Sequence, residues 1–260
     1  MGADPLVLSL GHEATALWFQ GYPQQALDKV EECGALADRI GQPAMQALAR
    51  FFACVLRVLR RDMRDAEQAA EALIEFSQER ELPDWLNWAK NIHGWALEHR
   101  GDHQGLEIIE QGIAAAFAVR AELMLTLYQI LLGQVHLQRG AFAKAQAAVE
   151  EGLVIAHRNH EVVYVAELHR LRGEIALLLA PDELASTTGA EKDFQESIRI
   201  AQEQQAKSWE LRTTLSLARW WASQGRAREA RERLTTVYTW FTEGFDTPDL
   251  IEARALLDNL

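Results

Sequence analysis

The sequence lacks an uninterrupted apolar run of the roughly 20 residues that a membrane-spanning helix requires, so we expect no membrane partner. Its N-terminus, MGADPLVLSLGHEA, has neither the basic segment nor the long apolar segment of a secretory signal peptide. The two cysteines, Cys33 and Cys54, are too few for a disulfide framework. These absences predict a cytoplasmic protein with reduced, unreactive thiols.

Basic residues are also in the minority, with 26 Lys and Arg against 38 Asp and Glu and a formal net charge of −12. A general nucleic-acid binder needs a basic surface that displaces counterions, so the composition argues against a nucleic-acid partner. Proline is scarce, with 6 residues in 260, whereas Ala, Leu, Glu, Gln and Arg are abundant. This composition favours helix over nearly the whole chain.

Motifs that carry chemistry are missing as well. The segment HEATA begins like a zinc-protease motif but has Ala16 where the second histidine belongs. The closest histidine pairs, His99 with His103 and His157 with His160, lack the third and fourth ligands that a zinc site needs. We find no phosphate-binding loop of the form G-x-x-x-x-G-K-[ST] and no nucleophile with its base. We therefore expect no enzyme activity, no cofactor and no metal.

What the sequence does contain is a repeated frame of small, apolar and turn residues. In the copy at 133–152 the frame includes Gly133, Gly140, Ala145 and Gly152. Five further copies follow the same spacing, one with a residue deleted and one with five inserted. The first small residues are Ala14, Cys54, Gly94, Gly133, Gly173 and Ala218, which are separated by 40, 40, 39, 40 and 45 residues.

The frame is typical of paired antiparallel helices. A small residue in each helix lets the two backbones approach, and a glycine between them ends the first helix at positive φ. We therefore expect Gly140 to turn the chain, and Gly133 and Gly152 to allow close helix contacts. One such pair cannot bury its apolar face alone, so neighbouring pairs must stack.

Two segments depart from the simple repeat. Residues 180–191, APDELASTTGAE, are predicted to form one long loop that holds the five inserted residues. Near the C-terminus, Thr247 is expected to cap a final helix whose first residue is Pro248, and Asp249 favours the helix dipole. The apolar stripe of that helix would cover the last repeat.

The frame resembles the tetratricopeptide repeat (TPR), although its pitch of about 40 residues exceeds the roughly 34 that are usual. The stretches ALWFQGYPQQAL, AELHRLRGEIALLLA, QQAKSWELRTTLSLARWW and WFTEGFDTPDLIEARALL look like the C-terminal repeats of large bacterial signalling proteins. Those proteins join a class III adenylate or guanylate cyclase or a kinase domain to a predicted ATPase of the STAND type. The resemblance implies a regulatory or sensing superhelix.

The predicted fold is an all-α, right-handed, TPR-like solenoid of about six antiparallel helix pairs with a C-terminal capping helix. We expect one domain over residues 1–260. Its predicted repeats and cap cover 6–41, 43–81, 83–119, 121–158, 160–205, 207–243 and 247–259.

In TPR-like superhelices the first helix of each pair lines a concave groove. The groove positions lie about three before, one after, and four to five after the small residue. Carried onto this chain, they predict a ligand-binding set that changes from aromatic and apolar, through amide, to charged. Its members are Trp18, Phe51, Val55, Trp88, Asn91, Trp95, His99, Gln134, Gln138, Glu167, Arg170, Glu174, Arg212 and Arg219.

Two functions are compatible with this face. It could bind a peptide or protein segment, including the ATPase or cyclase domains of the same system, as a non-catalytic regulatory module. Alternatively, it could clamp a small-molecule effector. A fold alone does not separate these functions, because function depends on the site. The sequence fixes no oligomeric state.

Overall fold

The computed structural model describes residues 4–118, 123–181 and 183–260, in which all regular structure is helical. The chain divides into two compact units. We call residues 1–119 unit 1 and residues 120–260 unit 2. Unit 1 holds six helices: α1 (Pro5–Gln20), α2 (Pro23–Ile40), α3 (Pro43–Arg60), α4 (Met63–Glu79), α5 (Pro83–His99) and α6 (Gly105–Ala118). The predicted boundary between repeats three and four lies outside the described residues, and the single-domain organisation stays a prediction.

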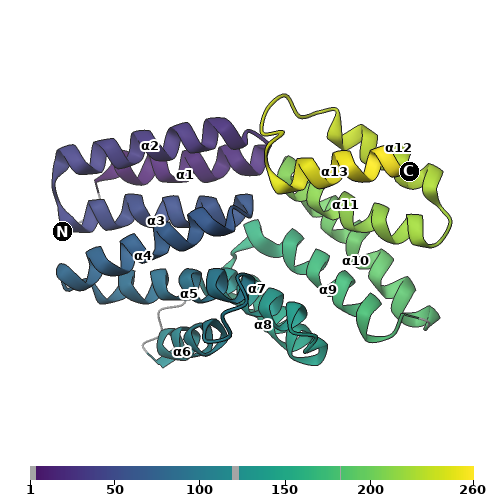
Figure 1. Ribbon diagram of the computed structural model, residues 1–260, viewed down its shortest axis with the longest axis horizontal. Coiled ribbons are helices and arrows are strands. Elements are labelled where there is room, and N and C mark those ends of the chain that lie inside the picture. Colours follow the sequence, from purple (N-terminus) through teal and green to yellow (C-terminus); the bar gives the residue numbers. More distant parts are fainter. Residues whose placement is uncertain (1–3, 119–122, 182) are drawn as a thin grey trace. The chain divides into compact units, whose positions relative to one another are not determined.

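Unit 2 continues the same alternation. It contains α7 (Leu125–Gln138), α8 (Phe142–Asn159), a 3₁₀ turn (Val162–Tyr164), α9 (Val165–Leu179), α10 (Leu184–Glu203), α11 (Lys207–Ser223), α12 (Ala227–Tyr238) and α13 (Pro248–Asn259). Odd-numbered helices α1 to α11 are the first helices of six pairs, even-numbered helices are the second, and α13 closes the chain (Figure 1). This is the expected all-α helical-repeat architecture.

Proline and glycine set the helix boundaries. Five of the six prolines, all but Pro181, occupy the start of a helix. Backbone N–H groups in the first turn make no hydrogen bond within the helix, so proline, which lacks this group, costs nothing there. Between α7 and α8, Gly140 has a φ of 71°, so it turns the chain as expected. Gly21 does the same between α1 and α2, with a φ of 92°.

The small residues of the frame lie where the two helices of a pair touch. In both helices of all six pairs these residues are buried. The tightest contact joins α5 to α6, where a Cβ built on Gly105 would lie 2.0 Å from the carbonyl oxygen of Gly94. Gly133 and Gly152 also face neighbouring helices: a Cβ would meet Val149 at 3.1 Å and Leu168 at 2.8 Å, respectively. The expectation that these glycines permit close approach is confirmed.

The first helices also contact each other from one pair to the next. Within unit 1, α1 packs on α3 and α3 on α5; within unit 2, α7 packs on α9, α9 on α11 and α11 on α13. Each unit therefore has a layer of consecutive first helices (Figure 1). One face of this layer is occupied by the second helices. The other face carries the side chains of the first helices that do not pack against the second helices.

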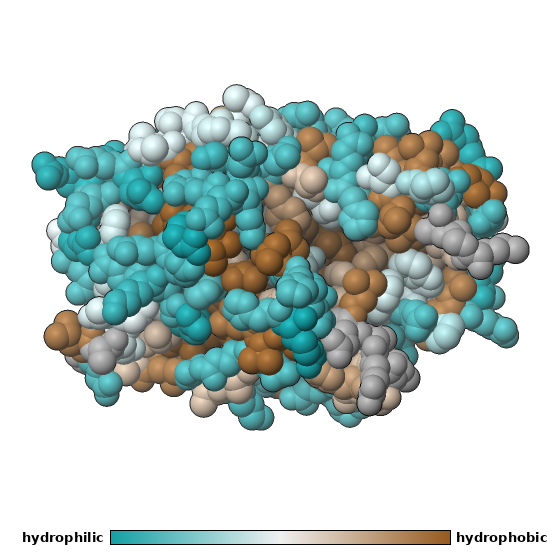
Figure 2. Space-filling model, turned by 180° about the vertical axis from the view of Figure 1, so that it is seen from behind, coloured by the Kyte–Doolittle hydropathy of each residue, from teal (hydrophilic) through white to brown (hydrophobic). Residues whose placement is uncertain are grey.

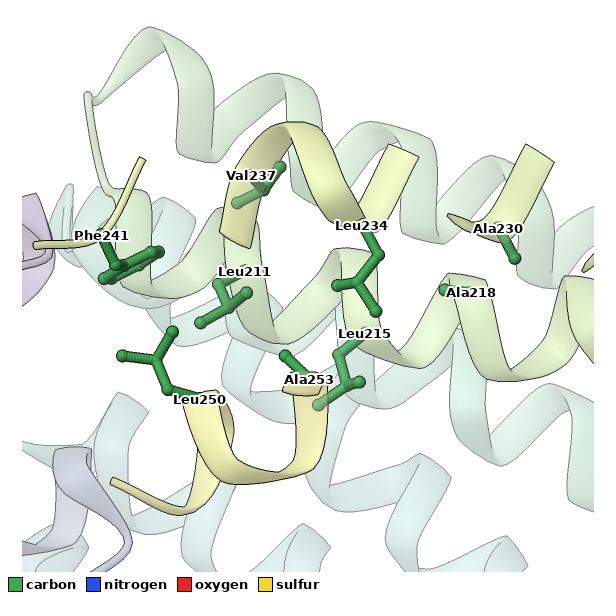
Figure 3. Packing of buried hydrophobic residues seen from close by; sticks show 9 residues of the cluster. All are labelled: Leu211, Leu215, Ala218, Ala230, Leu234, Val237, Phe241, Leu250 and Ala253. Carbon is green, nitrogen blue, oxygen red and sulfur yellow. The ribbon is translucent and has the colours of Figure 1, made fainter. Parts of the chain in front are cut away.

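The C-terminal helix caps the last pair. Leu250 and Ala253 of α13 are buried in one cluster with Leu211 and Leu215 of α11, and Figure 3 shows them pointing toward one another. Leu234 and Val237 of α12 complete this cluster from the other side. The apolar stripe of α13 therefore covers the last repeat, as its sequence pattern predicted.

Two local expectations are wrong. Thr247 precedes α13 at the N-cap position, but its hydroxyl donates to the Gly244 carbonyl oxygen at 2.7 Å and caps no helical N–H. The predicted loop over 180–191 is mostly helix, because α10 begins at Leu184 and is 20 residues long. The five inserted residues therefore lengthen a helix. Ala, Ser, Thr and Glu tolerate helix, and tertiary packing on α9 outweighs their turn tendency.

Hydrophilic residues cover much of the face shown in Figure 2, with hydrophobic residues in smaller areas. No helix among the described residues is long and apolar enough to cross a membrane. Both cysteines are buried, and burial raises the pKa of the Cys54 thiol to about 12. A thiol that stays protonated is a poor nucleophile, in agreement with a packing role.

We expect Gly105→Ala to lower the free energy of unfolding by about 1–3 kcal/mol, because the added methyl group would collide with the backbone of α5. Denaturant unfolding measures this change. Gly34→Ala is the matched control: Gly34 lies within α2 with no atom within 4 Å of an added Cβ. This substitution should stabilise the protein by about 0.5–1 kcal/mol through helix propensity. A Gly105→Ala variant as stable as the wild type would contradict the close contact.

Candidate functional site

The first helices of unit 2 carry a connected set of polar side chains on neighbouring helices. We call it the polar ladder, and its members are Gln134, Glu167, Arg170, Glu174, Arg212, Ser216 and Asp249. On α9, Glu167, Arg170 and Glu174 follow one another at intervals of three and four residues, which places them on one face of the helix. The spacing of these three residues in the sequence therefore creates the centre of the ladder.

Arg170 is the centre of the ladder and is 8% exposed. Its Nε and Nη2 atoms donate to the two carboxylate oxygens of Glu167, each at 2.7 Å, and its Nη1 lies 2.6 Å from Glu174 Oε1. Burial alone would lower the pKa of Arg170, but the two carboxylates more than offset it and raise the pKa above its ordinary value. The guanidinium is therefore charged and fixed in a fork that matches Glu167.

Neighbouring helices hold this centre in place. Ser216 of α11 donates its hydroxyl to Glu174 at 2.7 Å, and Arg170 Nη1 lies 3.3 Å from the same hydroxyl. From α7, Gln134 Nε2 donates to Glu167 at 3.4 Å. Three successive first helices thus meet at Glu167, Arg170 and Ser216.

The ladder ends at the capping helix. Arg212 of α11 donates through Nε and Nη2 to Asp249 Oδ2 at 2.9 and 2.6 Å, and both side chains are buried. The Arg212 guanidinium also lies 4.9 Å from the ring centre of Trp209, which adds a cation–π contact. Asp249, expected only to favour the dipole of α13, is in addition the partner of Arg212.

Five of the seven predicted residues of unit 2 belong to the ladder, and the other two lie near solvent. Gln138 is exposed at the end of α7. Arg219 is 47% exposed and pairs with Glu252 of α13. Ser216 and Asp249 were not among the binding residues predicted from the sequence. Ser216 lies two residues before Ala218, at a position that the groove pattern does not include. Asp249 could have been suggested by charge, because an Arg and an Asp on adjacent helices can form an ion pair.

The predicted residues of unit 1 are mostly aromatic or apolar and more buried. Trp88 contacts Phe51 with a ring distance of 5.0 Å and Trp85 with 4.8 Å, so α3 and α5 share an aromatic cluster. Trp85 was not among the residues predicted from the sequence. Val55 and Trp18 are 3% and 2% exposed. They pack within the protein and present little surface.

Along α5, the remaining predicted residues occupy different environments. Trp95 is buried, and its ring lies 4.6 Å from that of His99, whose Nδ1 is 2.9 Å from the Trp95 carbonyl oxygen. Burial lowers the pKa of His99, which favours the neutral ring. Asn91 is fully buried, and a Cβ on Gly112 would meet its amide at 2.4 Å. The structure therefore places Asn91 between α5 and α6 and not on an open surface.

The sequence matches no protein-family model and no curated protein. Several solved structures are nevertheless similar. The apo form of RapI has a TM-score of 0.63 and 10% identity, with 98% of this chain and 85% of that chain covered. NprR in complex with its cognate peptide NprX has a TM-score of 0.63 and 12% identity, with coverages of 100% and 72%.

A third similar structure is Bacillus thuringiensis PlcR in complex with the peptide PapR7 and DNA. Its TM-score is 0.61 and its identity 14%, with 78% of this chain and 72% of that chain covered. The chain has a TPR-like helical-repeat fold. At such low identity the likeness shows the fold alone, so the ligand must be argued from this chain's own residues.

We expect Arg170→Met to lower the free energy of unfolding by about 3–5 kcal/mol, because the buried Glu167 carboxylate loses its two short hydrogen bonds and keeps only the longer contacts with Gln134 and Arg212. Adding Glu167→Gln to that variant should recover about 1–3 kcal/mol, since an uncharged amide costs less to bury. Denaturant unfolding of the single and double variants measures both changes.

Arg199→Met is the matched control. Arg199 of α10 has Glu196 and Glu203 at the same spacing as Arg170 has Glu167 and Glu174, but in an exposed position. Water solvates all three groups there, so the substitution should have little effect on stability. Equal losses in Arg199→Met and Arg170→Met would show that burial of the ladder is not what stabilises it.

Proposed function

We propose that unit 2 binds a peptide or protein segment on the face of α7, α9 and α11 that carries the polar ladder, without catalysing a reaction. The observation that carries this proposal is the ladder itself: charged, amide and hydroxyl groups from three successive first helices are held in place by hydrogen bonds to one another. A ligand that binds such groups has little side-chain entropy to remove from the protein.

The accessible edge of the ladder supports a peptide ligand. Glu174 is 27% exposed although one of its oxygens accepts from Arg170 and Ser216. Gln134 is half-buried and Gln138 exposed along α7. A side-chain amide offers both a donor and an acceptor, which suits the alternating N–H and C=O groups of an extended peptide backbone. The partly exposed carboxylate of Glu174 on α9 suits a cationic or hydrogen-bond-donating group of the ligand.

The similar solved structures support the same class of ligand. NprR is described in complex with its cognate peptide NprX, and PlcR with the peptide PapR7 and DNA. These ligands are those of NprR and PlcR. For this chain they strengthen the case for a peptide without identifying its sequence.

The biological context is a further part of the proposal. The four stretches that resemble the C-terminal repeats of STAND-type ATPase and cyclase proteins suggest a regulatory or sensing role in a bacterial signalling system of that kind. On this account the bound segment belongs to the ATPase or cyclase domains of that system, or to a peptide that regulates them.

The function can be tested with a library of random peptides of about ten residues, selected on the immobilised wild-type chain. Selected peptides should bind Glu174→Gln about tenfold more weakly, because the substitution removes the accessible charge of the ladder. Isothermal titration calorimetry measures the affinities, and thermal unfolding checks that the variant is folded.

Glu203→Gln provides the matched control. Glu203 pairs with Arg199 at the same spacing as Glu174 with Arg170, but on the second helix α10, so its removal should leave peptide affinity unchanged. Equal binding by Glu174→Gln and wild type would refute the assignment of this face. If no peptide is selected and a panel of amino acids and nucleotides raises the melting temperature instead, the small-molecule alternative replaces the proposal.

A further inference from the structure

Three side chains with metal-binding atoms converge in unit 1. Glu67 and Glu71 lie one turn apart on α4, and His93 faces them from α5. One ligand atom from each residue lies within 4.8 Å of the others. This cluster shares no residue with the polar ladder and plays no part in the proposed peptide binding.

The ring of His93 gives the cluster its chemical character. Its Nε2 atom is buried and makes no hydrogen bond, yet it lies 3.4 Å from Glu71 Oε1. A buried nitrogen without a hydrogen bond is costly and calls for a partner such as an ion. Two ligands at about 2.0–2.1 Å from a tetrahedral zinc ion are separated by about 3.4 Å. The distance between His93 and Glu71 therefore fits two ligands of one metal.

Glu67 can supply the third ligand. Its side chain is largely buried and one carboxylate oxygen lies 2.9 Å from Arg100 Nη1. A carboxylate has two oxygens and about four acceptor sites, so this ion pair leaves acceptor capacity for a metal. Because the three ligand atoms lie within 4.8 Å of one another, the carboxylates must shift to bring all three to bonding distance from one ion, and Glu71, whose side chain is 56% exposed, has room to adjust.

A route from solvent is also present. A cavity of about 490 Å³ is lined by residues of α4 and α5 that include Glu67 and Glu71. His93 is not among its lining residues, so a hydrated ion would reach the two carboxylates first through this cavity. An accessible entry path is one of the requirements of a metal site.

We propose that Glu67, Glu71 and His93 bind one divalent transition-metal ion of the zinc type. The imidazole distinguishes this site from a calcium or magnesium site, because those ions prefer oxygen ligands throughout. Since α4 ends the second repeat and α5 begins the third, the bound ion links two repeats and stabilises unit 1. The ligands come from two helices and match no metal-binding motif, so the sequence gives no sign of the site.

The test is calorimetric titration of the metal-free protein with zinc chloride, together with thermal unfolding. We expect one ion per chain and a higher melting temperature with zinc. Glu71→Gln and His93→Asn should each weaken zinc binding by about tenfold or more, because each removes a ligand. Magnesium chloride should produce no comparable rise in melting temperature.

Two controls make the result decisive. His157→Asn removes an exposed histidine of α8 and should leave zinc affinity unchanged. Without metal, Glu71→Gln should melt close to the wild type because the side chain is largely exposed. The proposal is overturned if the wild type binds no zinc, or if both ligand variants bind zinc as tightly as the wild type.

Discussion

The constraint on which the rest of the structure depends is the backbone contact within each helix pair. A small side chain is required on both helices, and the buried partners are Ala14 and Ala26, Cys54 and Ala66, Gly94 and Gly105, Gly133 and Ala145, Gly173 and Ala190, and Ala218 and Ala230. Because this contact fixes one side of every first helix, the opposite side can vary without loss of the fold. Binding chemistry can therefore change from repeat to repeat.

The two units use that freedom differently. In unit 1 the first helices α3 and α5 join through Phe51, Trp85 and Trp88, which bury apolar surface. In unit 2 the equivalent layer is joined by polar contacts. Gln134 of α7 and Ser216 of α11 hydrogen-bond to the ion pairs of Arg170 on α9, and Arg212 of α11 pairs with Asp249 of α13. Buried ion pairs tolerate few alternative arrangements, because separating the partners leaves an uncompensated charge. The ladder thus fixes how α7, α9, α11 and α13 pack within unit 2.

The sequence predicted the repeat, but not always which side chains each helix turns toward the groove. The small-residue spacing identified the six pairs, and the residues at the start of the final helix together with its apolar stripe identified the cap, since both signals are local in the sequence. The predicted groove set includes Glu167 and Arg170 of α9 and Arg212 of α11, whose charged groups the structure brings close together. It also includes Asn91, which the structure places against Gly112, because a shift of a fraction of a turn moves a side chain between groove and pair contact.

Other features depend on tertiary contacts that periodicity does not contain. The start of α10 at Leu184 is one of these, because packing on α9 decides whether that segment is helix or loop. The hydroxyl of Thr247 forms its hydrogen bond with the Gly244 carbonyl oxygen and not with a backbone N–H of α13. The convergence of Glu67, Glu71 and His93 likewise appears only when α4 and α5 lie side by side.

Photo-crosslinking tests the central claim most directly, namely that the first-helix face of unit 2 binds a peptide. A selected peptide carrying a photoreactive group is bound to the protein and irradiated, and the crosslinked residues are identified by mass spectrometry. The account predicts crosslinks to α7, α9 and α11. Crosslinks confined to α8, α10 and α12, or to unit 1, would contradict it.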